Sequence, residues 1–464
     1  MAEDVGGSIR VTKAVLEACF EAGKWDLLME HVQLLSKRRS QLKGAMQEYV
    51  RLAISYIDAT PDEDTKVKLI ETLLAVTMGK IFVEIERARL TKRLAKMKED
   101  AGDLAGATEL LQEVAVETFG AMHKQEKIAY ILEQVRLCLD RGDNIRAQIL
   151  AKKISPHAFK RAVADQAFGI EGTRIEPPEE GTPDMTTLKI RYYEMLIRYH
   201  AAEDNYLEVC RCYRAIYETD EVQADASRWQ AALRLICWFL ALAPAGVEHN
   251  TLLLTTAADK KLQDLPAYAD LLKVFTTMEI APWNVFSERF EAEMAAETSV
   301  SGLCGPEWGA GAEPAAQGRG GGGGGRGDPE SRCVPPSLQV FGEEKGAQRR
   351  EDLKLRVTQH NILVVAKYYS RVTLPRLAEL LSLPVEEAET RLCDMAIDKA
   401  LTVSIDRPKG IVRFGKAENA DDILNAWGRN IDRVLDTLTK VTQDISKETM
   451  QRAAVAAGGA GTSA

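Results

Sequence analysis

The sequence predicts a mainly α-helical protein: a tetratricopeptide-like solenoid of helical repeats, followed by a winged helix and a long C-terminal helix. Three observations predict this order. A turn followed by an amphipathic helix recurs four times, the periodicity changes after a glycine-rich stretch at 302–336, and apolar residues near the end alternate at spacings of three and four. The 464 residues suffice for two or three domains, or for one repeat array with an appended module.

The recurring feature is a short Gly- or Asp-containing turn at residues 22–25, 101–104, 141–144 and 203–206. Small or apolar residues follow each turn on one helix face: Trp25, Leu28, Val32, Leu35; Leu104, Ala107, Leu111, Val114; Ala147, Ala151, Ile154; and Tyr206, Val209, Tyr213, Ile216. In a solenoid, a helix pair covers such a face by stacking on the next pair. We therefore expect an irregular solenoid over residues 1–300. An ordinary helical bundle that reuses one turn type is the alternative.

Two stretches interrupt the helical pattern. Residues 168–184 are rich in Gly and Pro and predict a surface loop. Residues 301–340 contain a Gly-, Ala- and Pro-rich segment with six consecutive glycines, and we expect a disordered linker there. A nucleic-acid-binding tail of the arginine–glycine type is the alternative for 318–327, but this stretch has two arginines and no aromatic residue among its glycines.

The part from 341 to 418 predicts a winged helix. We expect helices at 353–369, 374–381 and 385–397, a short strand at 371–373, and a β-ribbon formed by 401–405 and 411–414. Many winged helices insert their second helix into DNA. Here residues 385–400 contain five acidic and two basic side chains, so phosphate would be repelled. Protein binding is the better interpretation.

Residues 419–453 predict one long helix with a narrow apolar seam, and a disordered tail follows at 454–464. The seam residues follow the a/d spacing of a coiled coil: Leu424, Trp427, Ile431, Val434, Leu438, Val441 and Ile445. So narrow a seam needs a helical partner. We expect helices of other subunits, with packing back on the chain's own winged helix as the alternative.

Composition and motifs argue against an enzyme. The net charge of −9 disfavours a general nucleic-acid binder. The six histidines and eight cysteines form no metal-ligand motif, and no P-loop or nucleophile-elbow motif occurs. We therefore expect no catalytic residues, no metal and no cofactor.

The start of the chain has no secretory signal, and its longest apolar run, 235–243, is too short to span a bilayer. We expect an intracellular protein without membrane contact.

The basic stretches at 36–39 and 87–98 have two interpretations. Charge runs on helices are usually solvated faces, and the alternative is a docking face for an acidic partner.

A solenoid that ends in a winged helix and a long helix resembles the PCI-domain family, the scaffold subunits of the proteasome lid, the signalosome and a translation initiation complex. The strings at 34–43, 79–92, 131–139, 213–217, 275–279 and 367–373 are very like those of a proteasome-lid member, and the similarity covers most of 10–300 and 340–452. Family members usually have further helical sequence ahead of the part that matches Val11. We recognise no family counterpart of the segment 302–336.

The resemblance implies a non-catalytic scaffold in the regulatory-particle lid that supports ubiquitin-dependent degradation in cytoplasm and nucleus. Its implied partners are other PCI-type lid subunits, the lid deubiquitinase, and the ATPase ring or core particle through the solenoid. Nucleic acid and membrane are not expected partners. The alternatives are a signalosome subunit and, more remotely, a winged-helix nucleic-acid binder.

Two sets of residues are predicted to bind partners. The first set is the seam. The second is the strand residues, because short edge strands leave backbone groups for a neighbour: Leu401, Val403, Ile405, Ile411 and Phe414.

Overall fold

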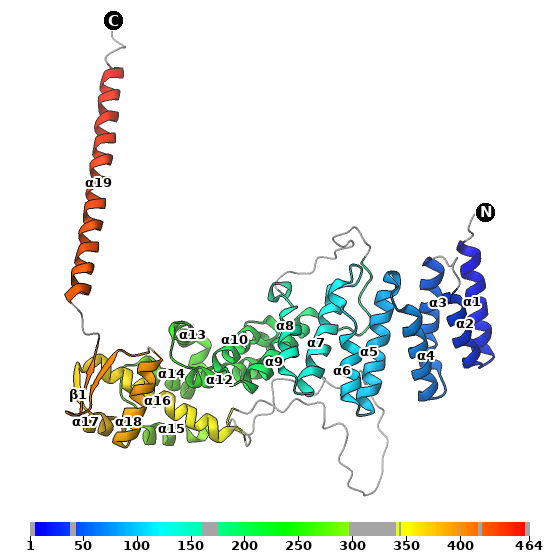
Figure 1. Ribbon diagram of the computed structural model, residues 1–464, viewed down its shortest axis with the longest axis horizontal. Coiled ribbons are helices and arrows are strands. Elements are labelled where there is room, and N and C mark those ends of the chain that lie inside the picture. Colours follow the sequence, from blue (N-terminus) through cyan, green and yellow to red (C-terminus); the bar gives the residue numbers. More distant parts are fainter. Residues whose placement is uncertain are drawn as a thin grey trace. The chain divides into compact units, whose positions relative to one another are not determined.

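The computed structural model describes residues 5–37, 43–159, 175–296, 340–342, 345–398, 400–415 and 420–459. Two compact units are present. Unit 1 comprises Met1–Thr277 and Ser287–Arg356, and unit 2 comprises Met278–Phe286 and Val357–Ala464. Both are mainly helical, as predicted (Figure 1). The expected linker lies outside the described residues apart from Val340, and so do Arg38 and Arg39 of the first basic stretch.

The first 296 residues form a succession of helices. The α-helices are α1 (Val5–Glu21), α2 (Trp25–Lys37), α3 (Lys43–Ser55), α4 (Glu63–Thr77), α5 (Glu84–Asp100), α6 (Leu104–Gln112), α7 (Lys124–Asp140), α8 (Asn144–Lys152), α9 (Met185–Ala202), α10 (Tyr206–Tyr217), α11 (Asp220–Ala224), α12 (Ala226–Leu242), α13 (Val247–Ala257), α14 (Pro266–Thr276) and α15 (Trp283–Ala296). Short 3-10 helices lie between them at Ile57–Ala59, Ile81–Val83, Val116–Thr118, Pro156–Phe159 and Lys260–Asp264.

The four predicted turns share one geometry. Gly23, Gly102, Gly142 and Asp204 have positive φ values of 64°, 89°, 82° and 56°. A left-handed residue after the helix end turns the chain back, so that the next amide reaches a carbonyl in the previous helix turn, as in Asp143 N to Cys138 O at 2.9 Å. Glycine adopts this conformation without strain. The repeated turn therefore joins α1 to α2, α5 to α6, α7 to α8 and α9 to α10.

The predicted apolar faces line the core of unit 1. One cluster joins α1 to α5 around Tyr49 and Ile70, and a second joins α5 to α9 around Ala88 and Cys138. The apolar run at 235–243 is buried throughout. Burial also raises the pKa of the Cys210 and Cys212 thiols to about 12, as fits core cysteines. None of the described helices is long and apolar enough to cross a membrane.

The described residues that follow the expected linker still belong to unit 1, up to Arg356. The ring of Phe341 packs edge-on against Trp238, with their centroids 5.0 Å apart, and Tyr206 donates a hydrogen bond to Asp352 at 2.7 Å. Lys345 donates to the carbonyl oxygen of Ala202 at the end of α9. Phe341 and residues 345–356, which were predicted to belong to the winged helix, therefore pack in unit 1. The helix α16 (Gly346–Tyr368) begins seven residues before the predicted start at 353.

Unit 2 contains the winged helix. Its elements after α16 are β1 (Arg371–Thr373), α17 (Leu374–Leu381), α18 (Val385–Ile397), β2 (Val403–Asp406) and β3 (Ile411–Phe414). The antiparallel sheet has the order β1–β3–β2. The predicted first ribbon strand, 401–405, is displaced by two residues at its start, because the amides of Ala400 and Leu401 both donate to Met395 O at the end of α18.

The last helix, α19, spans Ala420–Gly459. It is longer than predicted, since residues 454–459 were expected to be disordered. The sequence there is rich in alanine, the residue with the highest helix propensity, which extends the helix beyond the apolar seam.

Candidate functional site

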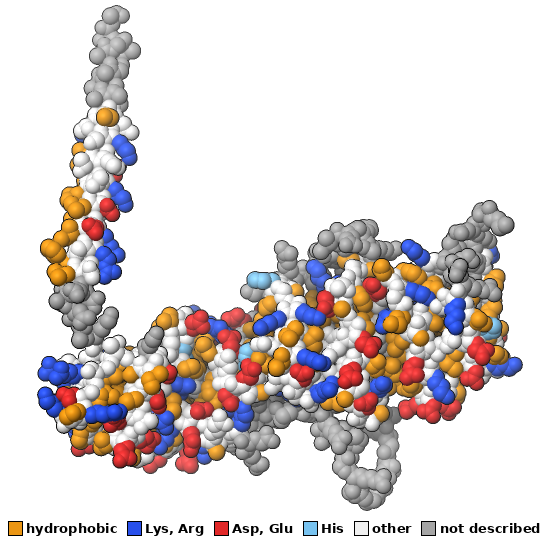
Figure 2. All heavy atoms as spheres, in the orientation of Figure 1, with side chains coloured by type: hydrophobic (Ala, Val, Ile, Leu, Met, Phe, Trp, Pro, Cys, Tyr) orange, Lys and Arg blue, Asp and Glu red, His pale blue; other side chains and the backbone are white. Residues whose placement is uncertain are grey.

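All seven predicted seam residues of α19 are exposed. The exposed fractions of Leu424 and Trp427 are 61% and 64%, and Ile431, the least exposed of the seven, is 38% exposed. Orange apolar side chains follow one side of this helix in Figure 2, and charged ones lie on the other side. Contiguous exposed apolar surface of this kind marks an interaction site. The seam is therefore the first candidate assembly surface.

Sequence reasoning missed one seam residue. Leu435 is 55% exposed and lines a shallow hollow with Trp427, Asn430, Ile431 and Val434. It lies four residues after Ile431 and so shares its helix face. The strict alternation of three and four excluded Leu435, and a search at i+4 from Ile431 would have found it. The apolar stripe is thus wider at its middle than a two-position seam.

Four of the five predicted strand residues pack against the core of the winged helix, and the fifth, Ile411, is paired within the sheet. Leu401, Val403, Ile405 and Phe414 pack partly buried against the winged-helix core, and Ile411 lies opposite Thr373 and Asp406. Ile411 and Phe414 belong to β3, the central strand, whose two edges are already paired. The four packed side chains are thus engaged by their own unit. What the sheet leaves for a partner is the backbone of an outer strand.

The hydrogen-bond pattern shows which backbone groups of β2 point outward. Gly415 N donates to Thr402 O, so residues 402 and 415 form a hydrogen-bonded pair. Such pairs alternate with non-bonded pairs in an antiparallel ladder. Ser404 opposite Arg413 is therefore bonded, whereas Val403 opposite Phe414 is not. The N–H and C=O groups of Val403 and Ile405 consequently point away from β3, toward the open edge.

The outer face of the same sheet carries arginines. Arg371 on β1 lies directly opposite Arg413 on β3, and Ser404 on β2 is the next residue across. All three are exposed, whereas the neighbouring Val372 and Val412 are buried on the inner face. Figure 2 shows blue side chains at the end of unit 2 where Figure 1 labels β1. No signal at the level of sequence had singled out these arginines.

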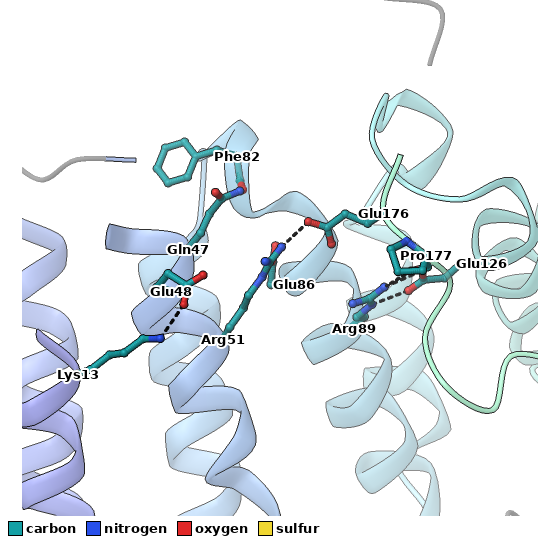
Figure 3. A network of polar contacts seen from close by, with 10 residues as sticks. All are labelled: Lys13, Gln47, Glu48, Arg51, Phe82, Glu86, Arg89, Glu126, Glu176 and Pro177. Atoms are coloured by element: carbon teal, nitrogen blue, oxygen red, sulfur yellow. Dashed lines mark hydrogen bonds and ion pairs between the residues drawn. The ribbon is translucent and has the colours of Figure 1, made fainter. Parts of the chain in front are cut away.

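In unit 1, ion pairs join successive helix pairs (Figure 3). Arg51 Nε on α3 donates to Glu86 Oε1 on α5 at 2.8 Å. Arg89 on α5 donates through Nε and Nη2 to both carboxylate oxygens of Glu126 on α7, at 2.7 and 2.9 Å. The partners are 35 and 37 residues apart, which is close to one tetratricopeptide repeat of about 34 residues. The hydrogen bond that Arg89 donates to Glu126 holds the pKa of Arg89 above its ordinary value.

An extended segment, residues 175–184, crosses these helices, and we call it the strap. It belongs to the predicted loop at 168–184, whose first residues, 168–174, lie outside the described part. Glu176 N donates to Ala121 O at 3.0 Å, and the Glu176 carboxylate forms an ion pair with Arg51. Further along, Gln125 Nε2 donates to Pro183 O at 2.7 Å. The strap therefore contacts α3 and α7, which are not consecutive helices.

Three arginines serve both the helices and the strap. Arg51 has Glu86 and Glu176 as partners, and Arg89 adds Pro177 O at 3.4 Å to its helix carboxylate. Arg93 lies 3.8 Å from Glu179 of the strap and 3.5 Å from Asp58. Part of the basic stretch at 87–98 thus faces acidic groups of its own chain, which weakens its interpretation as a docking face for an outside partner.

Models of known protein families match the helical repeats, the winged-helix part and the last helix separately. Family models match at residues 1–169 and 166–225 (PSMD12/CSN4, N-terminal), 337–416 (PCI domain) and 421–453 (26S proteasome regulatory subunit RPN5 C-terminal domain). The 26S proteasome non-ATPase regulatory subunit 12 homolog A of Arabidopsis thaliana is 45% identical over 452 residues, which cover 97% of this chain and 93% of the relative. The 26S proteasome regulatory subunit RPN5 of Saccharomyces cerevisiae is 31% identical, with coverage of 96% and 87%.

The chain belongs to the family of 26S proteasome non-ATPase regulatory subunit 12. This confirms the resemblance drawn from the sequence. Subunit 4 of the COP9 signalosome from Drosophila melanogaster is also similar, at 21% identity over 89% of this chain and 86% of the relative, so the signalosome alternative has only distant support. Within the family, the exposed seam of α19 coincides with the segment that the RPN5 C-terminal model matches.

Proposed function

We propose that this chain is a non-catalytic scaffold subunit of the proteasome regulatory-particle lid, and that α19 joins it to helices of other lid subunits. The observation that carries the proposal is the exposed seam, which lies within the segment matched by the RPN5 C-terminal model. An apolar side chain such as Leu or Ile gains about 1.5 to 3 kcal/mol when it is fully buried. Seven such residues on one helix favour a partner over solvent.

The solenoid and the winged helix complete the proposal. The ion pairs between repeats and the strap support a rigid arm, and the open edge of β2 supports strand addition by a neighbouring subunit. In this role the chain positions the lid deubiquitinase near the ATPase ring without performing chemistry itself. The lid subunits, the deubiquitinase, and the ATPase ring or core particle are the proposed partners. Cytoplasm and nucleus are the proposed locations, which fluorescence microscopy of the tagged chain would test.

The test is a charge placed in the seam. Ile431→Asp combined with Leu438→Asp introduces two carboxylates that would be buried without partners, at a cost of several kcal/mol. We expect the tagged double variant to lose co-purification with proteasome regulatory subunits, measured by mass spectrometry. The solenoid should stay folded by circular dichroism, because its contacts are local.

The matched control places the same charges on the polar face. Asn425→Asp combined with Gln443→Asp adds two aspartates to exposed positions on the opposite side of α19, and incorporation should stay at the wild-type level. Wild-type incorporation of the seam variant would refute the role of α19. Collapse of the isolated fold would show instead that the seam packs on the chain's own winged helix.

A further inference from the structure

Among the residues that the structure describes, two arginines of the winged helix have no acidic partner. Among the described residues of unit 2 before α19, three arginines are paired with carboxylates: Arg376 with Glu379, Arg391 with Glu387, and Arg407 with Glu389. Arg371 and Arg413 have no such partner within the described part of the chain. They are nevertheless directly opposite each other on β1 and β3. The residues that carry this unbalanced charge thus lie side by side on the outer face of the sheet.

The pair opposes the stability of the isolated sheet. Arg371 and Arg413 occupy a non-bonded position of the ladder, because Phe414 N donates to Ser370 O in the adjacent pair. Non-bonded positions bring opposite side chains closest, and like charges there are destabilising. An anionic group from outside the chain would remove this repulsion.

The geometry of β2 indicates where such a group would come from. At the open edge, the N–H groups of Val403 and Ile405 can donate hydrogen bonds to one more strand, antiparallel or parallel, and their C=O groups can accept hydrogen bonds from it. Strands are about 4.8 Å apart, so a residue that faces Ser404 from an added strand lies about 10 Å from the backbone of Arg413. A glutamate and an arginine side chain together cover this distance. The open edge and the arginines therefore belong to one surface.

We propose that the outer face of this sheet is a docking surface for an acidic strand of a neighbouring protein subunit, which adds to the edge of β2 and pairs a carboxylate with Arg413, beside Arg371. This inference rests on the proposed function, because it names the chemistry of a partner for the winged helix. A strand held by both backbone and charge explains why the sheet keeps two like charges on adjacent strands.

The test reverses one charge in the full-length chain. In Arg413→Glu the new carboxylate lies opposite Arg371, so the unfolding midpoint of the isolated protein should equal or exceed that of the wild type. Co-purification of regulatory subunits should nevertheless fall about tenfold or more, since like-charge juxtaposition at an interface is costly. Arg413→Lys keeps the charge and should retain most of the incorporation. Wild-type incorporation should decrease as salt concentration rises, and the variant should lose this dependence.

The control reverses another charge of the same unit. Arg376→Glu changes the exposed arginine of α17, outside the sheet, and should incorporate like the wild type. The inference is overturned if the Arg413→Glu variant incorporates normally, or if the Arg376→Glu variant loses as much incorporation. It is also overturned if the Arg413→Glu variant has a lower unfolding midpoint than the wild type, because the loss of incorporation would then come from unfolding. Wild-type incorporation reports on the proposed function, whereas the ratio of variant to wild type reports on this surface. The two can therefore fail separately.

Discussion

Arg89 and Glu126 form a bidentate ion pair across the interface between α5 and α7, with N–O distances of 2.7 and 2.9 Å. The Glu126 side chain is only 7% exposed and that of Arg89 is 24% exposed. A pair so shielded from water is costly to break, because the remaining partner keeps its charge without compensation. It therefore links two repeats more firmly than surface pairs do.

Glu126→Gln should weaken this link. Hydrogen bonds to charged groups contribute about 1.5 to 3 kcal/mol, and we expect the local opening free energy of α5 and α7 to fall by about 2 kcal/mol. Native-state hydrogen exchange of these helices is the measurement. Glu248→Gln is the matched control, because Glu248 pairs with Arg211 at the same sequence separation of 37 but is 69% exposed. That change should cost less than about 1 kcal/mol. Equal costs would mean that burial of the pair is irrelevant.

The strap should detach when its carboxylates are neutralised. Glu176→Gln with Glu179→Gln removes the negative charges that the strap presents to Arg51 and Arg93, and charge-assisted hydrogen bonds are roughly twice as strong as neutral ones. We expect the amide of Glu176, which donates to Ala121 O, to exchange about tenfold faster or more. Glu180→Gln, in the same segment but with no ion pair in the described structure, should leave exchange unchanged. Unaltered exchange in the double variant would show that backbone contacts alone hold the strap.

Alkaline pH should destabilise the first core cluster through Tyr49. Burial raises the pKa of Tyr49 to about 12, whereas in the unfolded chain it is near 10. The folded state thus binds this proton more tightly, so its contribution to stability is complete below pH 10 and is lost as pH rises through 12. Its full size is about 2.7 kcal/mol for a difference of two units.

Tyr49→Phe isolates this effect. The Tyr49 hydroxyl is buried without a hydrogen-bond partner among the described residues, so its removal should leave stability at pH 7 unchanged or slightly higher. The urea midpoint of the variant should exceed that of the wild type by a margin that grows between pH 10 and 12. If the difference in urea midpoint stayed constant with pH, the loss of stability at alkaline pH would come from groups other than Tyr49.

Proline substitutions should separate the two sides of β2. Ser404→Pro removes an amide that faces β3 and should unfold the sheet, because proline cannot donate to the ladder. Val403→Pro removes an amide that faces the open edge, so the isolated winged helix should keep its fold while incorporation falls. Circular dichroism and co-purification measure the two effects. The reverse outcome would invalidate the ladder assignment.

Local patterns in the sequence predicted most of the helices and strands and seven residues of the apolar seam. Gly102 and Gly142 mark turns because only a residue tolerant of positive φ ends a helix in this way. Residues 371–373 and 411–414 were identified as strands with their bounds, and Ile431 and Leu438 were placed on one helix face by spacing alone. Each of these features depends on a few neighbouring residues.

Contacts between distant residues were decided only by the tertiary structure. Arg51 meets Glu176 across 125 positions, and no periodicity encodes such a pair. Residues 341–356 join unit 1 because Phe341 packs on Trp238, although the sequence around them suggested only the start of the winged helix. The opposition of Arg371 and Arg413 depends on sheet register, which long-range pairing sets. The amino-acid sequence by itself determined the helices, turns and strands through local backbone preference, whereas packing determined which charges meet and which edge stays open.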